Sequence, residues 1–510
     1  MQKTRLHLID NNNKILKPIF FSILIFYIYQ AFKLNNYETL FIDERLLIDD
    51  IYNIWFLDDY YNRFVNIENG VYKNLLIFIT EIAYGGDLRY GRLWSNIFTL
   101  IVGPLTFISD HFVITFTRII NIGIFVVSCV IFSKNFVNEK FFWFSLISMF
   151  SLPGLEILIR IPKPEILALF FISIGMLFLS KQKPSYSIFF VAIATFIKIN
   201  FAPVLLLSFY LLLIQEKNRI LFMIRNGVVI LFSLLIVNPI LIIPPVKIGS
   251  IQFPNFYKIY LNWISSQGSF GQEDVISFEF FLSWMNTLAN FYKLPIGVGY
   301  LIFLGLTLHL LLNYKNTVNT NETYSKLLLS IFTFYMLFYF FFIERQFTWY
   351  LYTPFLFLVL FLLSDKNNYL YNNSFQILIL IFVFLGNFSN INHHISEKSF
   401  NANYKYGYMD INSEKQAVEL VGDVLLEIDM IYNNNPLLQK DLVFWNPNLF
   451  IPRKNVTYDK NFQTREYWGG EEIESILDTA DVYVTNENIV SDEILKTKIE
   501  NYFVYYKMSK

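Results

Sequence analysis

Long apolar stretches separated by short polar loops run through the first 394 residues of the chain. A window of about 19 residues, the length that crosses a bilayer as a helix, finds about eleven of them. They cover residues 18–35, 112–133, 141–157, 164–180, 186–199, 201–215, 227–245, 296–313, 327–343, 347–364 and 375–391. A further apolar stretch, 93–107, contains Gly103 and Pro104 and is either re-entrant or spanning. The pattern predicts a mainly α-helical, polytopic transmembrane bundle.

The pattern changes after residue 394, where apolar runs shorten and polar residues increase. Segments 441–450 and 480–489 have the composition of buried strands, and segments 414–432 and 471–477 have the spacing of amphipathic helices. We therefore expect two domains, a transmembrane domain over 1–394 and a small α/β domain over 395–510. The second contains no Gly-rich phosphate loop, His-rich cluster or nucleophile elbow, so we expect it to position a substrate or cover the first domain.

Lys and Arg residues in the short loops predict the orientation of the spans. These loops carry Lys3, Arg5, Lys14, Lys17, Lys134, Lys140, Lys181, Lys183, Lys217, Arg219, Arg225, Lys315, Lys326 and Lys366. Cytoplasmic loops are enriched in such residues, so the N-terminus is predicted inside. Loops 36–111 and 246–295 and the α/β domain are then extracytoplasmic. The first span lacks a small-residue cleavage site, which predicts a retained anchor in a multi-pass protein of the inner (plasma) membrane.

Composition supports the membrane assignment and excludes other classes. Of the 510 residues, 55% are hydrophobic and only 16% are charged, which is too apolar for a soluble protein of this length. A net charge of −1 offers no basic excess for nucleic acid. The single cysteine, Cys129, excludes an intramolecular disulfide and a Cys-based zinc site. Adjacent His393 and His394 have no favoured ligand spacing, so we predict no metal site there.

Charged residues gather in four segments on the predicted external side. They are Asp43 and Glu44 after the first span, Asp87 and Arg89 between glycines of the first loop, Glu156, Arg160, Lys163 and Glu165 at the turn before the fourth span, and Glu344 and Arg345 before the tenth. Charges beside lipid are unfavourable unless they are solvated or used, so these segments are candidates for a site.

The order of these segments resembles the GT-C fold of integral membrane glycosyltransferases, which includes aminoarabinose transferase and protein O-mannosyltransferase. The motifs are the D-E pair, Arg118 in FTRIINIGIF, R-x-x-K-P-E-I-L-A-L-F-F, A-T-F-I-K-I-N-F-A-P and R-x-x-x-W-Y-L-Y-T-P, spread over residues 15–365. The resemblance implies a polyprenyl-phosphate-linked sugar donor, transfer on the extracytoplasmic face, and Asp43 as the catalytic acid of the motif, beside Glu44. The acceptor, whether glycan, lipid-linked saccharide or protein, does not follow from it.

The chemistry of such a transfer calls for the same residue types. Moving a sugar to a hydroxyl needs a base for the acceptor proton, and a carboxylate such as Asp43 or Glu44 contributes roughly 100- to 10,000-fold as one. The departing phosphate gains negative charge, which cations stabilise, and Arg binds phosphate oxygens in a fork. Arg345, Arg160 and Lys163 are the candidates for this contact. No organic cofactor is predicted, and the need for a divalent metal stays open.

Each assignment has a structural alternative. Asp43 and Glu44 could be solvated residues at a helix end, and Arg345 could pair with Glu344. Arg160 and Lys163 could extend to the membrane surface with their stems in lipid. Arg118 and Lys198 are expected to pair with internal acids and hold helices together rather than bind substrate.

Two other protein classes share this pattern. A transporter or flippase of lipid-linked saccharides predicts inverted repeats and charges near the bilayer midplane, whereas the charges here gather at external helix ends. A polymerase or ligase predicts arginine-rich external loops and usually no appended α/β domain.

Overall fold

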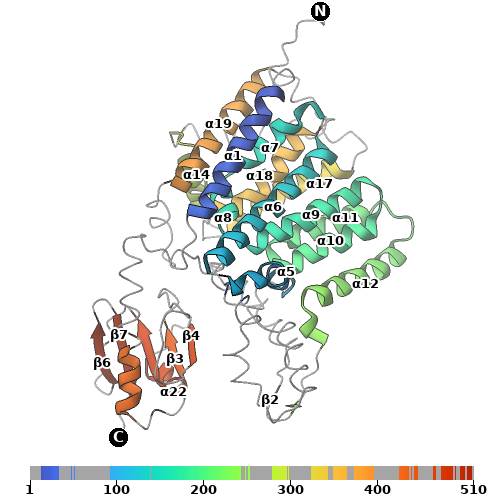
Figure 1. The fold of residues 1–510 in the computed structure, drawn as a ribbon. Helices are drawn as coiled ribbons and strands as arrows, with labels where there is room; N and C mark the ends of the chain where they lie inside the picture. The colour runs from blue at the N-terminus through green and yellow to red at the C-terminus, as the bar shows by residue number, and fades with distance from the viewer. Residues whose placement is uncertain are drawn as a thin grey trace, which may run out of the picture. The chain divides into compact units, whose positions relative to one another are not determined.

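The computed structural model divides the chain into two compact units, with a boundary between His394 and Ile395 (Figure 1). In the first unit it describes residues 13–33, 92–108, 110–137, 139–242, 278–295, 323–342, 348–364 and 373–394, with short pieces at 47–48, 51, 247–248, 251–252 and 297. In the second it describes 395, 424, 426–435, 438, 442–445, 463–466, 473–485, 489, 494–499 and 502–507. The two units are considered separately below.

The first unit is mostly helical, as the apolar pattern predicts. Its helices are α1 (Asn13–Lys33), α5 (Arg92–Val102), α6 (Asp110–Phe136), α7 (Phe142–Phe150), α8 (Leu155–Arg160), α9 (Pro164–Ser180), α10 (Pro184–Ile197), α11 (Ala202–Leu213), α12 (Arg219–Val237), α14 (Phe278–Phe291), α17 (Thr323–Phe342), α18 (Thr348–Leu363) and α19 (Asn373–Ile395). Short 3-10 turns are η5 (Gly103–Phe107), η6 (Glu139–Phe141), η7 (Ile199–Phe201) and η8 (Pro239–Ile242). Strands β1 (Lys247–Ile248) and β2 (Ile251–Gln252) form a small antiparallel pair.

Three helices in the described part of the chain are long and apolar enough to cross a membrane. Their apolar segments are Lys14–Phe32 in α1, Phe112–Phe136 in α6 and Arg219–Val237 in α12. Only 28% and 22% of the α1 and α12 segments are buried within the protein, so most of their apolar surface faces outward. Large exposed apolar faces are typical of lipid contact, and these helices indicate a membrane protein.

The predicted span 141–157 is wrong as a single helix. Helix α7 ends at Phe150, and α8 starts again at Leu155, after Gly154 adopts a left-handed conformation with φ of 83°. Pro153 cannot donate a backbone hydrogen bond, and a positive φ suits glycine, so the Pro-Gly pair breaks the helix. The predicted span 227–245 is also displaced, because α12 starts at Arg219 and ends before Pro239. Predicted span 296–313 lies outside the described residues, apart from residue 297.

The second unit contains the predicted small sheet. Its strands are β3 (Leu442–Trp445), β4 (Gln463–Glu466), β5 (Val482–Thr485), β6 (Ile494–Ile499) and β7 (Tyr502–Lys507), in the order β4-β3-β5-β7-β6. Strand β3 is parallel to both neighbours, with Val443 opposite Thr464 and Val482. Strand β7 is antiparallel to β5 and β6. The sheet is therefore mixed, with a parallel half that requires crossover connections.

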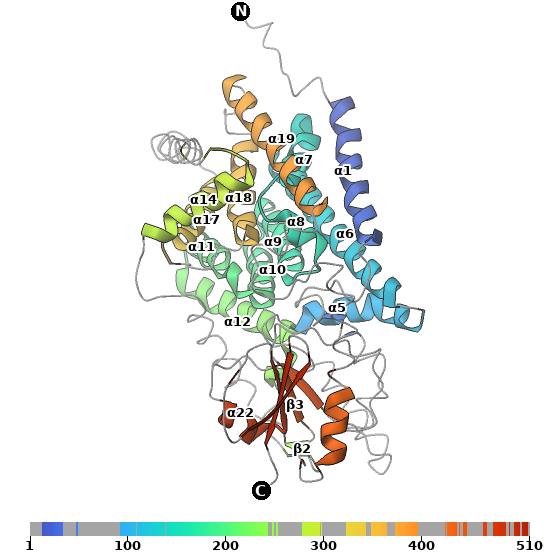
Figure 2. The ribbon, with the colours of Figure 1, turned by 90° about the vertical axis from the view of Figure 1, so that its left-hand side faces the viewer.

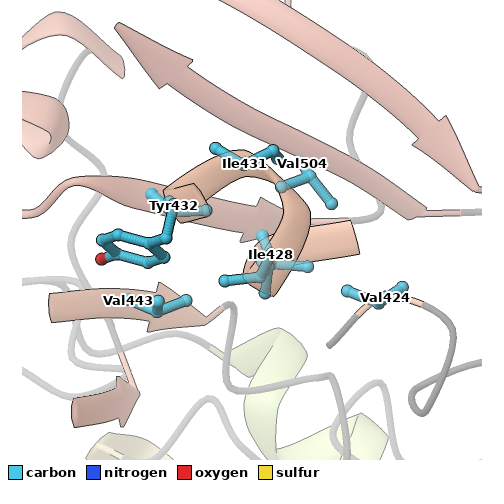
Figure 3. Packing of buried hydrophobic residues seen from close by; sticks show 8 residues of the cluster. Val424, Ile428, Ile431, Tyr432, Val443 and Val504 are labelled. Carbon is cyan, nitrogen blue, oxygen red and sulfur yellow. The ribbon is translucent and has the colours of Figure 1, made fainter. Parts of the chain in front are cut away.

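Alternating residues of the central strands pack on opposite faces of this sheet. Val482, Val484 and Val504 join one cluster with Ile428 and Tyr432 from helical residues 426–434 (Figure 3). Tyr483, Phe503 and Tyr505 join another cluster with residues of α22 (Ile473–Thr479). Because successive side chains of a strand point to opposite faces, the two helices cover the two sides of the sheet. The unit is a small three-layer α/β domain.

Candidate functional site

The structure describes part of the predicted set of site residues. Asp43, Glu44, Asp87, Arg89 and Arg345 lie outside the described residues. Glu156 and Arg160 belong to helix α8, but their side chains lie outside the description. Lys163 and Glu165 are described in full, and both are buried, with exposed fractions of 2% and 6%. The site is therefore built from the turn before α9.

The backbone of this turn fixes the position of Glu165. Lys163 is the cap residue of α9, with an extended φ of −98° and ψ of 148°, and Pro164 follows as the first helical residue. Proline suits that position because its missing N–H would have no partner in the first turn, and its φ is already helical. Glu165 then stands in the first turn, where the helix dipole stabilises a carboxylate by roughly 0.3–1 kcal/mol.

The next helix brings Lys198 to the same place. Helix α10 packs against α9 and returns antiparallel to it, and Lys198 caps its C-terminus. The two helices approach closely at Gly175, where an added Cβ would lie 2.7 Å from Cγ2 of Val191. A cation at a helix C-terminus is favourable for the same electrostatic reason as an anion at an N-terminus. The hairpin therefore places opposite charges at neighbouring helix ends.

Glu165 and Lys198 form an ion pair in this buried position. Lys198 Nζ lies 3.3 Å from Glu165 Oε1, and the two side chains are 13% and 8% exposed, respectively. This contact is coulombic, because neither carboxylate oxygen of Glu165 has a hydrogen-bond partner among the described residues. The expectation that Lys198 pairs with an internal acid is confirmed.

Helix α6 supports the turn from another side. The Asn121 side-chain amide donates to the carbonyl oxygens of Leu158, at 2.8 Å, and Ile161, at 3.2 Å. These carbonyls belong to the end of α8, so Asn121 holds the segment that leads into Lys163. Arg118 lies one turn earlier, on the same side of α6, and is only 1% exposed. Helix α6 therefore also carries a buried positive charge, one turn before Asn121.

Helix α19 holds the break between α7 and α8. The Asn390 side-chain amide donates to the carbonyl oxygens of Phe150, at 2.9 Å, and Leu152, at 3.1 Å. A Cβ at Gly386 would overlap the carbonyl oxygen of Ser151, so the two backbones are in close contact. Unpaired carbonyls are unfavourable away from water, and these amides satisfy them. Helix α19 therefore lies beside α7, as both views show (Figure 1, Figure 2).

Helix α17 fixes the turn that follows Lys198. The Tyr335 hydroxyl donates to the carbonyl oxygen of Asn200, at 2.6 Å, and Tyr335 is 1% exposed. From the last turns of α10, the Thr195 hydroxyl donates to the carbonyl oxygen of Phe201, at 3.3 Å. The position of Lys198 is therefore set by contacts on both sides.

Helix α5 contains a buried arginine, Arg92, that was not among the charged residues chosen from the sequence. It packs against α6, α10 and α12, and Figure 2 shows it between the ends of α6 and α12. The Arg92 backbone N–H donates to Asn238 Oδ1, at 3.1 Å, and the Arg92 guanidinium donates to Ser95, at 2.8 Å. Arg92 is buried on the apolar face of α5, and that amphipathic face is the sequence signal that could have found it.

The described residues include no group of three or more His, Cys, Asp or Glu side chains that could hold a metal ion. No family of known proteins matches the chain, and neither a curated protein nor a solved structure is similar to it. The chemical capacity of the site is therefore judged from its own groups. An ionised carboxylate accepts hydrogen bonds from hydroxyl groups, and the neighbouring cations suit an anion such as phosphate.

Proposed function

We propose that this protein is a membrane glycosyltransferase of the GT-C type that moves a sugar from a polyprenyl-phosphate donor to an acceptor outside the cytoplasm. The observation that carries the proposal is a group of ionisable residues with little or no exposure where α9 begins and α10 ends. Lys163 and Glu165 are buried there, and Lys198 is only 13% exposed, in a unit made chiefly of apolar helices. Arg118 is a further buried ionisable residue, on α6. Ionisable groups in such surroundings are unfavourable, and they mark substrate sites more often than packing sites.

The proposed roles follow the sequence resemblance. Asp43, with Glu44 beside it, takes the proton of the acceptor hydroxyl as that oxygen attacks the anomeric carbon. Arg345, Arg160 and Lys163 contact the phosphate that leaves with the lipid. The proposal includes about eleven spans with the N-terminus inside, and it places both long loops and the α/β domain outside. The acceptor is a glycan, a lipid-linked saccharide or a protein.

A transporter of lipid-linked saccharides is the second candidate, because transporters also contain broken helices such as α7–α8. Broken helices in transporters expose backbone carbonyls that coordinate ions. Here the carbonyl oxygens of Phe150 and Leu152 accept from Asn390, and those of Leu158 and Ile161 accept from Asn121. Because these carbonyls are already bonded, the break resembles a fixed bend more than an ion site. This observation supports the enzyme over the transporter.

The test is a transfer assay with the full chain in nanodiscs and a synthetic polyprenyl-phosphate sugar. Asp43→Asn keeps the size of the side chain but cannot accept the proton, so turnover should fall by on the order of 100-fold or more. Arg345→Lys should retain more activity than Arg345→Ala, because it keeps the charge and loses only the fork. Glu139→Gln, at an exposed glutamate, is the control. Full activity of Asp43→Asn would remove Asp43 from the reaction.

A further inference from the structure

We infer that Glu165 binds a hydroxyl group of the donor sugar, and that Lys198 holds the Glu165 carboxylate in place for this contact. The inference rests on the proposed function and adds to it the group that recognises the sugar, as distinct from the lipid phosphate. The first observation is that the Glu165 carboxylate accepts no hydrogen bond from the described residues.

A buried carboxylate usually accepts several hydrogen bonds. Glu165 is 6% exposed, yet neither of its oxygens has a hydrogen-bond partner among the described residues. Its only described charge contact is Lys198, 3.3 Å from Oε1. Buried polar groups in native proteins are nearly always hydrogen-bonded, and an unpaired one points to a ligand, an ion or water. Because Oε1 faces the Lys198 ammonium, Oε2 is the oxygen with more capacity left to accept hydrogen bonds.

The chemistry of the pair selects the kind of ligand. An ionised carboxylate only accepts hydrogen bonds, so the ligand must donate, and a phosphate would be repelled. A cation is disfavoured because the Lys198 ammonium already stands beside the carboxylate, and the described residues contain no cluster of metal ligands. A neutral group that carries hydroxyls, such as a sugar ring, meets both conditions. The phosphate of the same donor is left to the cations already proposed for it, of which Lys163 is the described one.

Lys198 acts on the sugar through Glu165 and is a positioning residue. Its backbone N–H is bonded to the carbonyl of Ala194, and the turn after it is fixed by Tyr335. The backbone that carries the Lys198 ammonium is therefore fixed. The ammonium attracts Oε1 of Glu165 and makes no contact that uses the hydrogen-bonding capacity of Oε2. That leaves Oε2 free to accept from the sugar.

The experiment compares binding of lipids with and without the sugar. The full chain in nanodiscs is titrated with polyprenyl phosphate, polyprenyl-phosphate mannose and polyprenyl-phosphate arabinose, and the Kd of each is measured. Glu165→Gln replaces a charged acceptor by a neutral one, so it should weaken binding of the preferred sugar lipid by roughly 3- to 10-fold, the loss of about half the strength of a charge-assisted hydrogen bond. Binding of polyprenyl phosphate should stay within about twofold of wild type, since its phosphate does not contact Glu165. Glu139→Gln should bind all three lipids as wild type does.

A double variant separates this role from a structural ion pair. Glu165→Gln leaves Lys198 unpaired and could impair folding, whereas Glu165→Gln with Lys198→Met removes both charges together. We expect the double variant to have the thermal stability of wild type and the weak sugar-lipid binding of Glu165→Gln. Wild-type affinity for the sugar lipid in the double variant would overturn the inference. Failure of the wild-type chain to bind any of the three lipids would instead overturn the proposed function itself.

Discussion

Removal of the Asn390 amide tests the account of the helix break. Asn390 is fully buried and donates to two carbonyl oxygens, those of Phe150 and Leu152. Asn390→Leu keeps the branching and the number of heavy atoms of the side chain and leaves both carbonyls without this donor. Membrane proteins lose on average about 0.6 kcal/mol per interhelical hydrogen bond, which gives a lower limit of about 1 kcal/mol. A buried acceptor left without its donor costs roughly 1–3 kcal/mol, so two of them give an upper limit of about 6 kcal/mol. We expect a loss of about 2–3 kcal/mol.

Asn387→Leu is the matched control for this experiment. Asn387 lies three residues earlier on α19, is half-buried, and donates at 3.3 Å to the Ile147 carbonyl and at 2.9 Å to Val383 of its own helix. Neither acceptor belongs to the break, so the loss should stay below about 1 kcal/mol. The free energy of unfolding is measured for both variants by titration of the micelle with sodium dodecyl sulfate. A loss for Asn390→Leu no larger than that of Asn387→Leu would refute the role given to the amide.

Three further outcomes are expected. Gly154→Ala should lower the free energy of unfolding by about 1–2 kcal/mol, because the φ of Gly154 is 83°. Gly123→Ala on α6 should raise it by up to about 1 kcal/mol, because a Cβ added there meets no atom within 4 Å and alanine favours a helix. Both values are measured by the same titration. Gly386→Ala should cost about 1–3 kcal/mol and lower the melting temperature, since its Cβ would overlap the carbonyl of Ser151; an unchanged melting temperature would disprove the close contact. Single cysteines in each predicted external segment, on a Cys129→Ala background, should all react with an impermeant thiol reagent in intact cells, and labelling of only some would contradict the topology.

The apolar pattern predicts the helices well where a single run of lipid-compatible residues forms one element. It fails at Pro153 and Gly154, because a window of about 19 residues averages across a two-residue break whose apolar flanks are intact. It also places the start of α12 too late. Arg219 and Arg225 lower the local hydropathy, yet their long side chains can remain at a helix end or surface while the backbone stays helical.

In the α/β domain, the sequence predicts two of the five strands and misses β4, β6 and β7, although β7 contains buried apolar residues. Strands β3 and β5 lie within segments 441–450 and 480–489, and α22 overlaps segment 471–477. Strand β4, with the sequence QTRE, was not expected because it is a polar edge strand without apolar alternation. Its pairing with β3 is set by residues distant in sequence, which a local pattern does not contain.

The candidate site was predicted in part. The charged turn at Lys163 and Glu165 could be seen in the sequence because charges there interrupt an apolar run. The contact of Glu165 with Lys198 depends on the packing of α9 against α10, and the missing hydrogen bonds of Glu165 depend on every neighbour. Neither property follows from residue spacing.

The short hairpin of α10 and α11 has a consequence for the shape of the bilayer. These helices contain 14 and 12 residues, which extend about 21 and 18 Å, whereas the hydrocarbon layer is about 30 Å thick. A bilayer thins around hydrophobic segments that are too short for it. In the proposed membrane arrangement, headgroups and water descend toward the turn at Lys198. A lipid-linked phosphate would then reach the depth of the ion pair as part of the indented surface, while its polyprenyl chain stays in the hydrocarbon.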